Sequence, residues 1–192
     1  MLGHKKNWYF QGWQSRKELS PSGRLHTVWE YNDDYYSFDL SAKRFRLLKI
    51  SFVAIPALII VIWILFSLMR SFARDSILYV GVFWYTSTIP MIYMVMGAVG
   101  AIRMKEEMTY RDLYACYRRI KLSSWVLPVL FLFSLIGTFV FVIRFAENYS
   151  IRMERMHVIG CLILFLLSLA LFIIQLKVKK KIIVSKKRTE EE

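Results

Sequence analysis

The chain has 192 residues, of which 56% are hydrophobic and 16% aromatic, and its formal net charge is +13. Ordinary soluble domains have an apolar share of about 45 to 50%, so the composition favours a membrane protein. A basic chain often binds nucleic acid, but here the charge borders long apolar stretches, where it attracts anionic lipid headgroups. We therefore predict a bilayer with anionic headgroups as a partner, and no nucleic-acid binding.

Residues 1–46 precede the first long apolar stretch and have the pattern of a small β-meander. "SPSG" at 20–23 and "NDD" at 32–34 are turn signals. Between them, "RLHTVWEY" at 24–31 alternates in the manner of a strand. "YYSF" at 35–38 is expected to pair back on it as a further strand.

The alternation places Leu25, Trp29 and Tyr31 on one face of the predicted strand. A meander of this size does not bury enough surface to be stable alone, so this face must rest on something. We keep three alternatives for it: an anchor in the membrane interface, a docking face for a protein partner, or a cap over an active site.

Four stretches free of charged residues follow, with lengths of 20, 27, 22 and 21 residues. Because about 20 apolar residues in a helix cross the hydrocarbon core, the sequence predicts an all-α integral membrane protein. The membrane domain is expected to cover 47–176, with transmembrane helices at about 47–69, 76–102, 122–143 and 156–176.

The basic residues predict the orientation of these helices. Most of the Lys and Arg residues, 22 of 27, lie on one side of the predicted membrane. They comprise Lys49 and the basic residues before the first helix, between the second and third helices, and after the fourth helix. Since basic residues stay on the cytoplasmic side, both termini are predicted to be cytoplasmic, with 177–192 as a basic, solvated tail. Compactness and the shortage of outer domains favour a bacterial cytoplasmic membrane as the location.

The starts of the first and third predicted helices resemble each other. "KISFVAIPAL" at 49–58 and "KLSSWVLPVL" at 121–130 share Lys, Ser, Pro and Leu at the same spacing. One interpretation is a tandem duplication of a helical hairpin. The alternative is convergence of two basic-to-apolar boundaries, and the poor match between the second and fourth helices favours it.

Several residues of the spans are candidates for helix bends, packing or a polar lining. A proline frees backbone carbonyls that hydroxyl groups, neighbouring helices or water must satisfy. The candidate bends are Pro56, Pro90 and Pro128, and the candidate polar lining is Thr86, Ser87 and Thr88. These hydroxyls have a simpler alternative role, which is to bond their own backbone.

Gly97 and Ala101 form a small-xxx-small pair that allows another helix to approach closely. The segment 109–121 is predicted to be an amphipathic helix at the cytoplasmic interface, started by Thr109 with Asp112 three residues later. Cys116 and Cys161 are expected to lie too far apart to pair.

We predict no catalytic, cofactor-binding or metal site. The three histidines are dispersed, and the spans hold no Asp, Glu, Arg or Lys apart from Lys49 at the edge of the first one, whereas ion-coupled transporters need such groups inside a span. We therefore expect a non-enzymatic accessory or scaffolding subunit that has a protein partner or self-associates. A small uncoupled channel or carrier acting as a homo-oligomer is the alternative, and a membrane enzyme acting on lipids is the third hypothesis.

Overall fold

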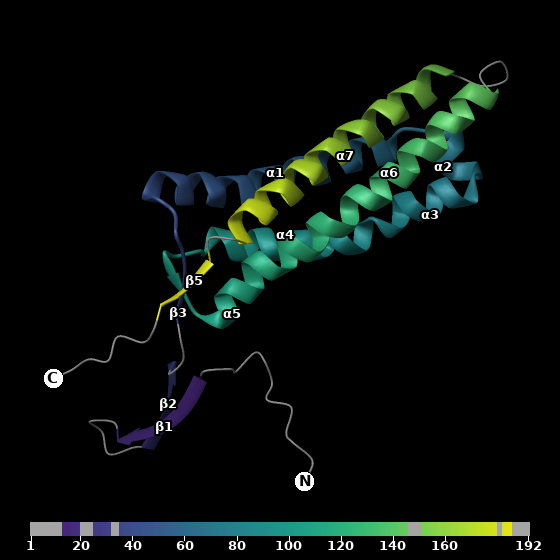
Figure 1. Ribbon diagram of the computed structural model, residues 1–192. Helices are drawn as coiled ribbons and strands as arrows, with labels where there is room; N and C mark the ends of the chain where they lie inside the picture. Colours follow the sequence, from purple (N-terminus) through teal and green to yellow (C-terminus); the bar gives the residue numbers. More distant parts are fainter. Residues whose placement is uncertain (1–12, 20–24, 32–34, 146–150, 180–181, 186–192) are drawn as a thin grey trace, which may run out of the picture.

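The structure, a computed structural model, describes residues 13–19, 25–31, 35–145, 151–179 and 182–185. It consists mainly of long helices, with two small sheets at one end of the bundle (Figure 1). We call this end the sheet end. The opposite end, where the short helix α2 (Phe72–Ser76) lies, is called the α2 end.

The first sheet is an antiparallel hairpin of β1 (Trp13–Leu19) and β2 (Leu25–Tyr31). Strand character in this region was therefore predicted correctly. Within the described residues, β1 and β2 pack mainly on each other rather than on the helices.

The second sheet joins three distant parts of the chain. β3 (Tyr35–Phe38) lies between β4 (Glu107–Met108) and β5 (Ile182–Ser185), antiparallel to both. The prediction that 35–38 pairs back on 24–31 is therefore wrong, and so is the prediction of a single meander. The segment expected to be a solvated tail contains β5, while its last residues, 186–192, lie outside the described part of the chain.

Phe38 gives the physical reason for this pairing. Its side chain is buried, with its ring centroid 6.3 Å from that of Phe45 and 6.1 Å from that of Tyr117. Burial of a large aromatic ring is worth about 1.5 to 3 kcal/mol. The strand therefore lies against the helical bundle, where its edges meet β4 and β5.

The first and fourth spans are α1 (Ala42–Leu68) and α7 (Ile151–Lys179). α7 extends beyond the predicted range at both ends, and α1 begins five residues early. Because β3 precedes α1 and β5 follows α7, the β3–β5 pairing brings the start of α1 and the end of α7 to the sheet end.

The second span is divided, although one helix over 76–102 was predicted. It follows the short helix α2, begins as α3 (Leu78–Thr86) and, after a turn at Ser87, continues as α4 (Thr88–Ile102). Pro90 cannot donate a backbone hydrogen bond to the carbonyl four residues earlier, which explains a break one turn before it. Proline at 90 thus lies in the first turn of α4, where its missing N–H costs little.

The third span is longer than predicted. α5 (Tyr110–Leu113) leads through a π-helical turn at 114–118 into α6 (Arg119–Phe145). The segment 109–121 is therefore not a separate helix, because it continues directly into α6. Its predicted cap is present, because the Asp112 N–H donates to the Thr109 hydroxyl at 3.3 Å.

Within the described part of the chain, four helices are long and apolar enough to cross a membrane: 42–68, 78–102, 110–145 and 152–179. Their shared core contains Phe52, Trp84, Phe131 and Leu164, all fully buried. Apolar side chains are also exposed along every span, whereas soluble monomers expose only small apolar patches. The length and apolar composition of the four helices suggest a multi-pass membrane protein.

Candidate functional site: a polar cluster at the α2 end

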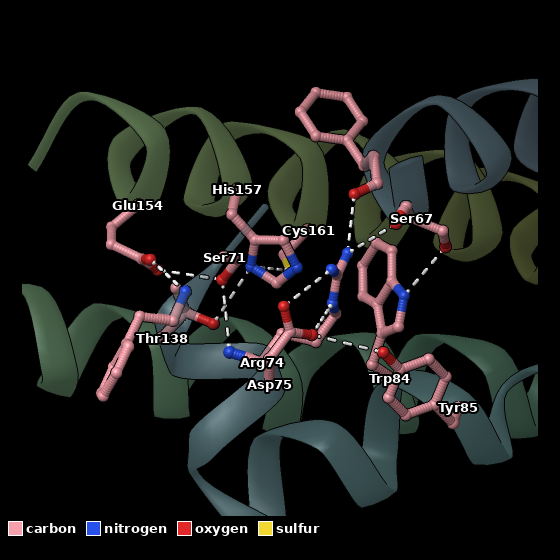
Figure 2. Close-up of polar contacts among 12 residues, drawn as sticks. Ser67, Ser71, Arg74, Asp75, Trp84, Tyr85, Thr138, Glu154, His157 and Cys161 are labelled. Carbon is pink, nitrogen blue, oxygen red and sulfur yellow. Dashed lines mark hydrogen bonds and ion pairs between the residues drawn. The ribbon is translucent and has the colours of Figure 1, made fainter. Parts of the chain in front are cut away.

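Polar side chains, most of them buried, gather at the α2 end (Figure 2). We call this group the polar cluster. It consists of Ser67, Ser71, Arg74, Asp75, Trp84, Tyr85, Ser134, Thr138, Glu154, His157 and Cys161. The residues come from α1, α2, α3, α6 and α7 and from the loop before α2.

Arg74 joins α2 to the C-terminal end of α1. Its Nη1 donates to the carbonyl oxygens of Phe66 at 2.9 Å and Ser67 at 3.1 Å. The last carbonyls of a helix have no partner within the helix, and a cation there also interacts favourably with the helix dipole. Although only 5% exposed, Arg74 therefore has its charge and most of its donors satisfied.

Asp75 pairs with the same arginine on its more exposed side. Its Oδ1 accepts from the Arg74 Nε at 2.8 Å, and the Tyr85 hydroxyl is 3.3 Å from the same oxygen. The hydrogen bond from Arg74 holds the pKa of Asp75 below its usual value of 3.8. Burial by itself would lower the pKa of Arg74, but the bond and the charge of Asp75 raise it overall. The pair is therefore ionised at neutral pH.

Glu154 joins α7 to the loop before α2. Its two carboxylate oxygens accept from the Ser71 hydroxyl at 2.9 Å and from the Phe72 N–H at 2.6 Å. Glu154 lies in the first turn of α7 and is 4% exposed. An anion is favourable at this position because the helix dipole is positive there.

His157 lies deeper, one turn further along α7. Its Nδ1 is 3.3 Å from the Thr138 hydroxyl and 3.7 Å from the Cys161 sulfur, which is itself 3.7 Å from the Ser134 hydroxyl. The His157 Nε2 is buried and has no hydrogen-bond partner among the described residues. The Trp84 ring packs on the imidazole, with centroids 4.7 Å apart.

The chemistry of this arrangement is constrained by burial. Cys161 and His157 have the side chains of a nucleophile and a base, but their residues are 0% and 1% exposed. A substrate must reach the reacting atoms, with a base at about 2.6 to 3.2 Å from the proton it removes. The cluster is better suited to holding five chain segments together than to turning over a substrate.

Sequence reasoning missed this cluster. The predicted spans left Arg74 and Asp75 in the connection between 47–69 and 76–102, and they placed His157 at the start of 156–176. Glu154 fell outside the predicted helix 156–176 but lies inside α7. The available signal was that a serine, a cation and a carboxylate follow the first span within a few residues, at 71–75.

The candidate lining residues do not share one surface. Ser87 is buried, and its hydroxyl donates to the Trp84 carbonyl at 2.6 Å. This is the alternative role considered above, in which the hydroxyl bonds the backbone of its own helix. Thr86 is exposed, and Thr88 is half-buried in the first turn of α4. The structure therefore does not bring the three hydroxyls together.

The candidate packing residue Gly97 lies in a close helix contact, and so does the neighbouring Gly100. Gly97 and Ala101 are buried on α4. A Cβ at Gly97 would lie 2.6 Å from the Ile120 Cγ1, and one at Gly100 would lie 3.0 Å from the Ala115 carbonyl oxygen. The small residues thus pack α4 against the π-helical turn and the start of α6 within one chain.

Pro56 and Pro128 are buried inside α1 and α6, which both continue past them. The suggested duplication that relates them stays a prediction.

Cys116 and Cys161 are both free and buried. Among the described residues, no three His, Cys, Asp or Glu side chains are grouped so that they could hold a metal ion.

The predicted docking face lies on the β1–β2 hairpin. Leu25 is 68% exposed, while the side chains of Trp29 and Tyr31 lie outside what the structure describes.

Comparisons of the chain with protein-family models, with curated proteins and with solved structures gave no match.

Proposed function

We propose that this protein is a non-enzymatic accessory or scaffolding subunit of a membrane complex, and that its β1–β2 hairpin binds a larger protein partner. The observation that carries the proposal is the isolation of the hairpin. Its strands pack mainly on each other within the described residues, and a two-stranded hairpin is marginally stable in water. A partner surface would supply the missing burial.

The strand register supports an apolar docking face. Trp13 is paired with Tyr31, and Leu19 with Leu25. Residues directly opposite in an antiparallel pair are on the same face of the sheet. One face therefore holds the register positions of Trp13, Leu19, Leu25, Trp29 and Tyr31, together with Ser15, Lys17 and Thr27. The positions of the opposite face are mostly charged or polar.

The proposed orientation places the sheet end in the cytoplasm. Segments at this end carry most of the Lys and Arg residues, as cytoplasmic loops do. The pairing of β3 with β5 is consistent with both termini on one side of the membrane. We propose a bacterial cytoplasmic membrane as the location, with the hairpin facing cytosolic proteins.

The closed polar cluster supports a structural role for the membrane domain. Arg74 donates to a carbonyl at the end of α1, and Glu154 accepts from the Phe72 N–H at the start of α2. These bonds link the ends of neighbouring helices. The channel alternative is less supported because Ser87 bonds its own helix. The lipid-enzyme alternative is less supported because Cys161 and His157 are sealed from substrate.

Affinity purification from the source membrane tests the proposal. The full chain should retain a stoichiometric protein partner in mild detergent. Thr27→Pro should abolish this retention, since proline disrupts a strand ladder, while the four-helix domain stays monodisperse. Gln14→Ser, an exposed change on the opposite face of the hairpin, is the matched control. A chain that purifies without any stoichiometric partner would overturn the proposal.

A further inference from the structure

A cavity of about 450 Å³ lies at the sheet end, between α4, the start of α6 and the end of α7. Its size is within the range of small-molecule sites, about 300 to 1,000 Å³. It is separate from the polar cluster, which lies at the α2 end.

The polar part of the cavity is strongly basic. Arg118, Arg119, Lys121 and Lys179 line it, and none of the described lining residues is acidic. The Arg118 guanidinium lies 4.8 Å above the centroid of the Tyr114 ring. This contact restrains a long side chain at the cavity edge. The electrostatics select an anion, and arginine in particular suits phosphate.

The other part of the cavity is apolar and reaches the outer surface of the helices. Leu122, Trp125 and Leu176 line it and are exposed on the faces of α6 and α7. Tryptophan is enriched where hydrocarbon meets headgroups. A small soluble anion would make no apolar contacts with these side chains. A phospholipid would, because its acyl chains lie close to its phosphate.

Gln175 is a second, independent observation that points to a ligand. The residue lines the cavity and is 2% exposed, and its side-chain nitrogen and oxygen have no partner among the described residues. Its backbone carbonyl, in contrast, accepts from the Tyr117 hydroxyl at 3.3 Å. A buried amide without partners is costly, so a ligand with oxygen acceptors and hydroxyl donors would be stabilised there.

We propose that this cavity binds the headgroup of an anionic glycerophospholipid. The four basic residues hold the phosphate, Gln175 bonds to the glycerol or ester oxygens, and the acyl chains leave past Trp125 and Leu176. The site is independent of the proposed partner binding by the hairpin.

The experiment uses the full chain in non-ionic detergent and counts bound lipids by native mass spectrometry. Phosphatidylglycerol is titrated against phosphatidylcholine. The variant Arg118→Gln with Lys121→Gln should bind phosphatidylglycerol roughly thirtyfold more weakly, since each basic residue near the headgroups contributes about 1 kcal/mol. The matched control is Arg44→Gln with Arg46→Gln, which removes the same charge from exposed positions near the start of α1. It should bind as the unmodified chain does.

Gln175→Leu separates binding from folding. We expect it to weaken phosphatidylglycerol binding without lowering the melting temperature of the lipid-free protein, because it removes an unpaired buried amide. The proposal would be overturned if all variants bound phosphatidylglycerol equally well. It would also be overturned if the unmodified chain bound phosphatidylcholine as tightly as phosphatidylglycerol. If glycerol 3-phosphate or inorganic phosphate bound at the same site as tightly as the lipid, the ligand would be a soluble phosphate and the lipid assignment would be wrong.

Discussion

Arg74→Met tests whether the polar cluster fixes the α2 end of the bundle. The change removes two hydrogen bonds from a buried cation to the Phe66 and Ser67 carbonyls, at 2.9 and 3.1 Å. A hydrogen bond to a charged group contributes about 1.5 to 3 kcal/mol, but burial of the arginine charge offsets part of this. The Asp75 side chain is 46% exposed, so the lost ion pair adds little. We therefore expect a loss of about 2 to 4 kcal/mol in the free energy of unfolding.

The assay is reversible unfolding in mixed micelles with increasing mole fraction of SDS, followed by circular dichroism. Arg70→Met is the matched control, because Arg70 is exposed and lies in the same connection between α1 and α2. It should change the free energy of unfolding by less than about 0.5 kcal/mol. If Arg74→Met and Arg70→Met had the same effect, the polar cluster would not stabilise the fold as we have argued.

Three further predictions concern other contacts. Gly100→Ala places a Cβ 3.0 Å from the Ala115 carbonyl oxygen, so it should destabilise the protein by about 1 to 3 kcal/mol in the same assay, whereas the exposed Val99→Ala should have a small effect. Ile183→Pro should break the β3–β5 pairing and accelerate amide hydrogen exchange in β3; unchanged protection would contradict the register. The lowered pKa of Asp75 predicts a stabilising contribution that is complete above about pH 4 and is lost as the pH falls below its usual value of 3.8. Asp75→Asn should flatten this acid limb of the stability profile, and an unchanged limb would show that another group titrates.

The four spans could be predicted because the length of a charge-free stretch is a local property of the sequence. The close contact at Gly97 has a local signal too, since small residues on an apolar helix allow close approach. The cap at Thr109 follows from two residues three positions apart, and it too is present.

The sheet at the end of the bundle was not predictable in this way. β3, β4 and β5 are separated by about 70 residues each, and β4 is only two residues long. The alternation of 24–31 and the turn at 32–34 favoured a local third strand. The burial of Phe38 against Phe45 and Tyr117 depends on tertiary contacts that local patterning does not contain.

The polar cluster could not be predicted for a related reason. Arg74 and Glu154 are 80 residues apart in the sequence, and each looks like an ordinary charge at the end of a span. The two side chains are buried only because α2 packs against the ends of the other helices. The break at Ser87 follows from Pro90 but could have fallen at several positions, because a proline affects the whole preceding turn.

Photo-crosslinking in the source membrane tests the accessory-subunit account most directly. A photoreactive amino acid at Leu25, which is exposed on the hairpin, reports what the proposed docking face touches. The account predicts one discrete adduct with a larger, different protein, and its loss when Thr27→Pro disrupts the strand pair. The contradicting result would be crosslinks to lipid alone, or an adduct with the mass of two copies of this chain.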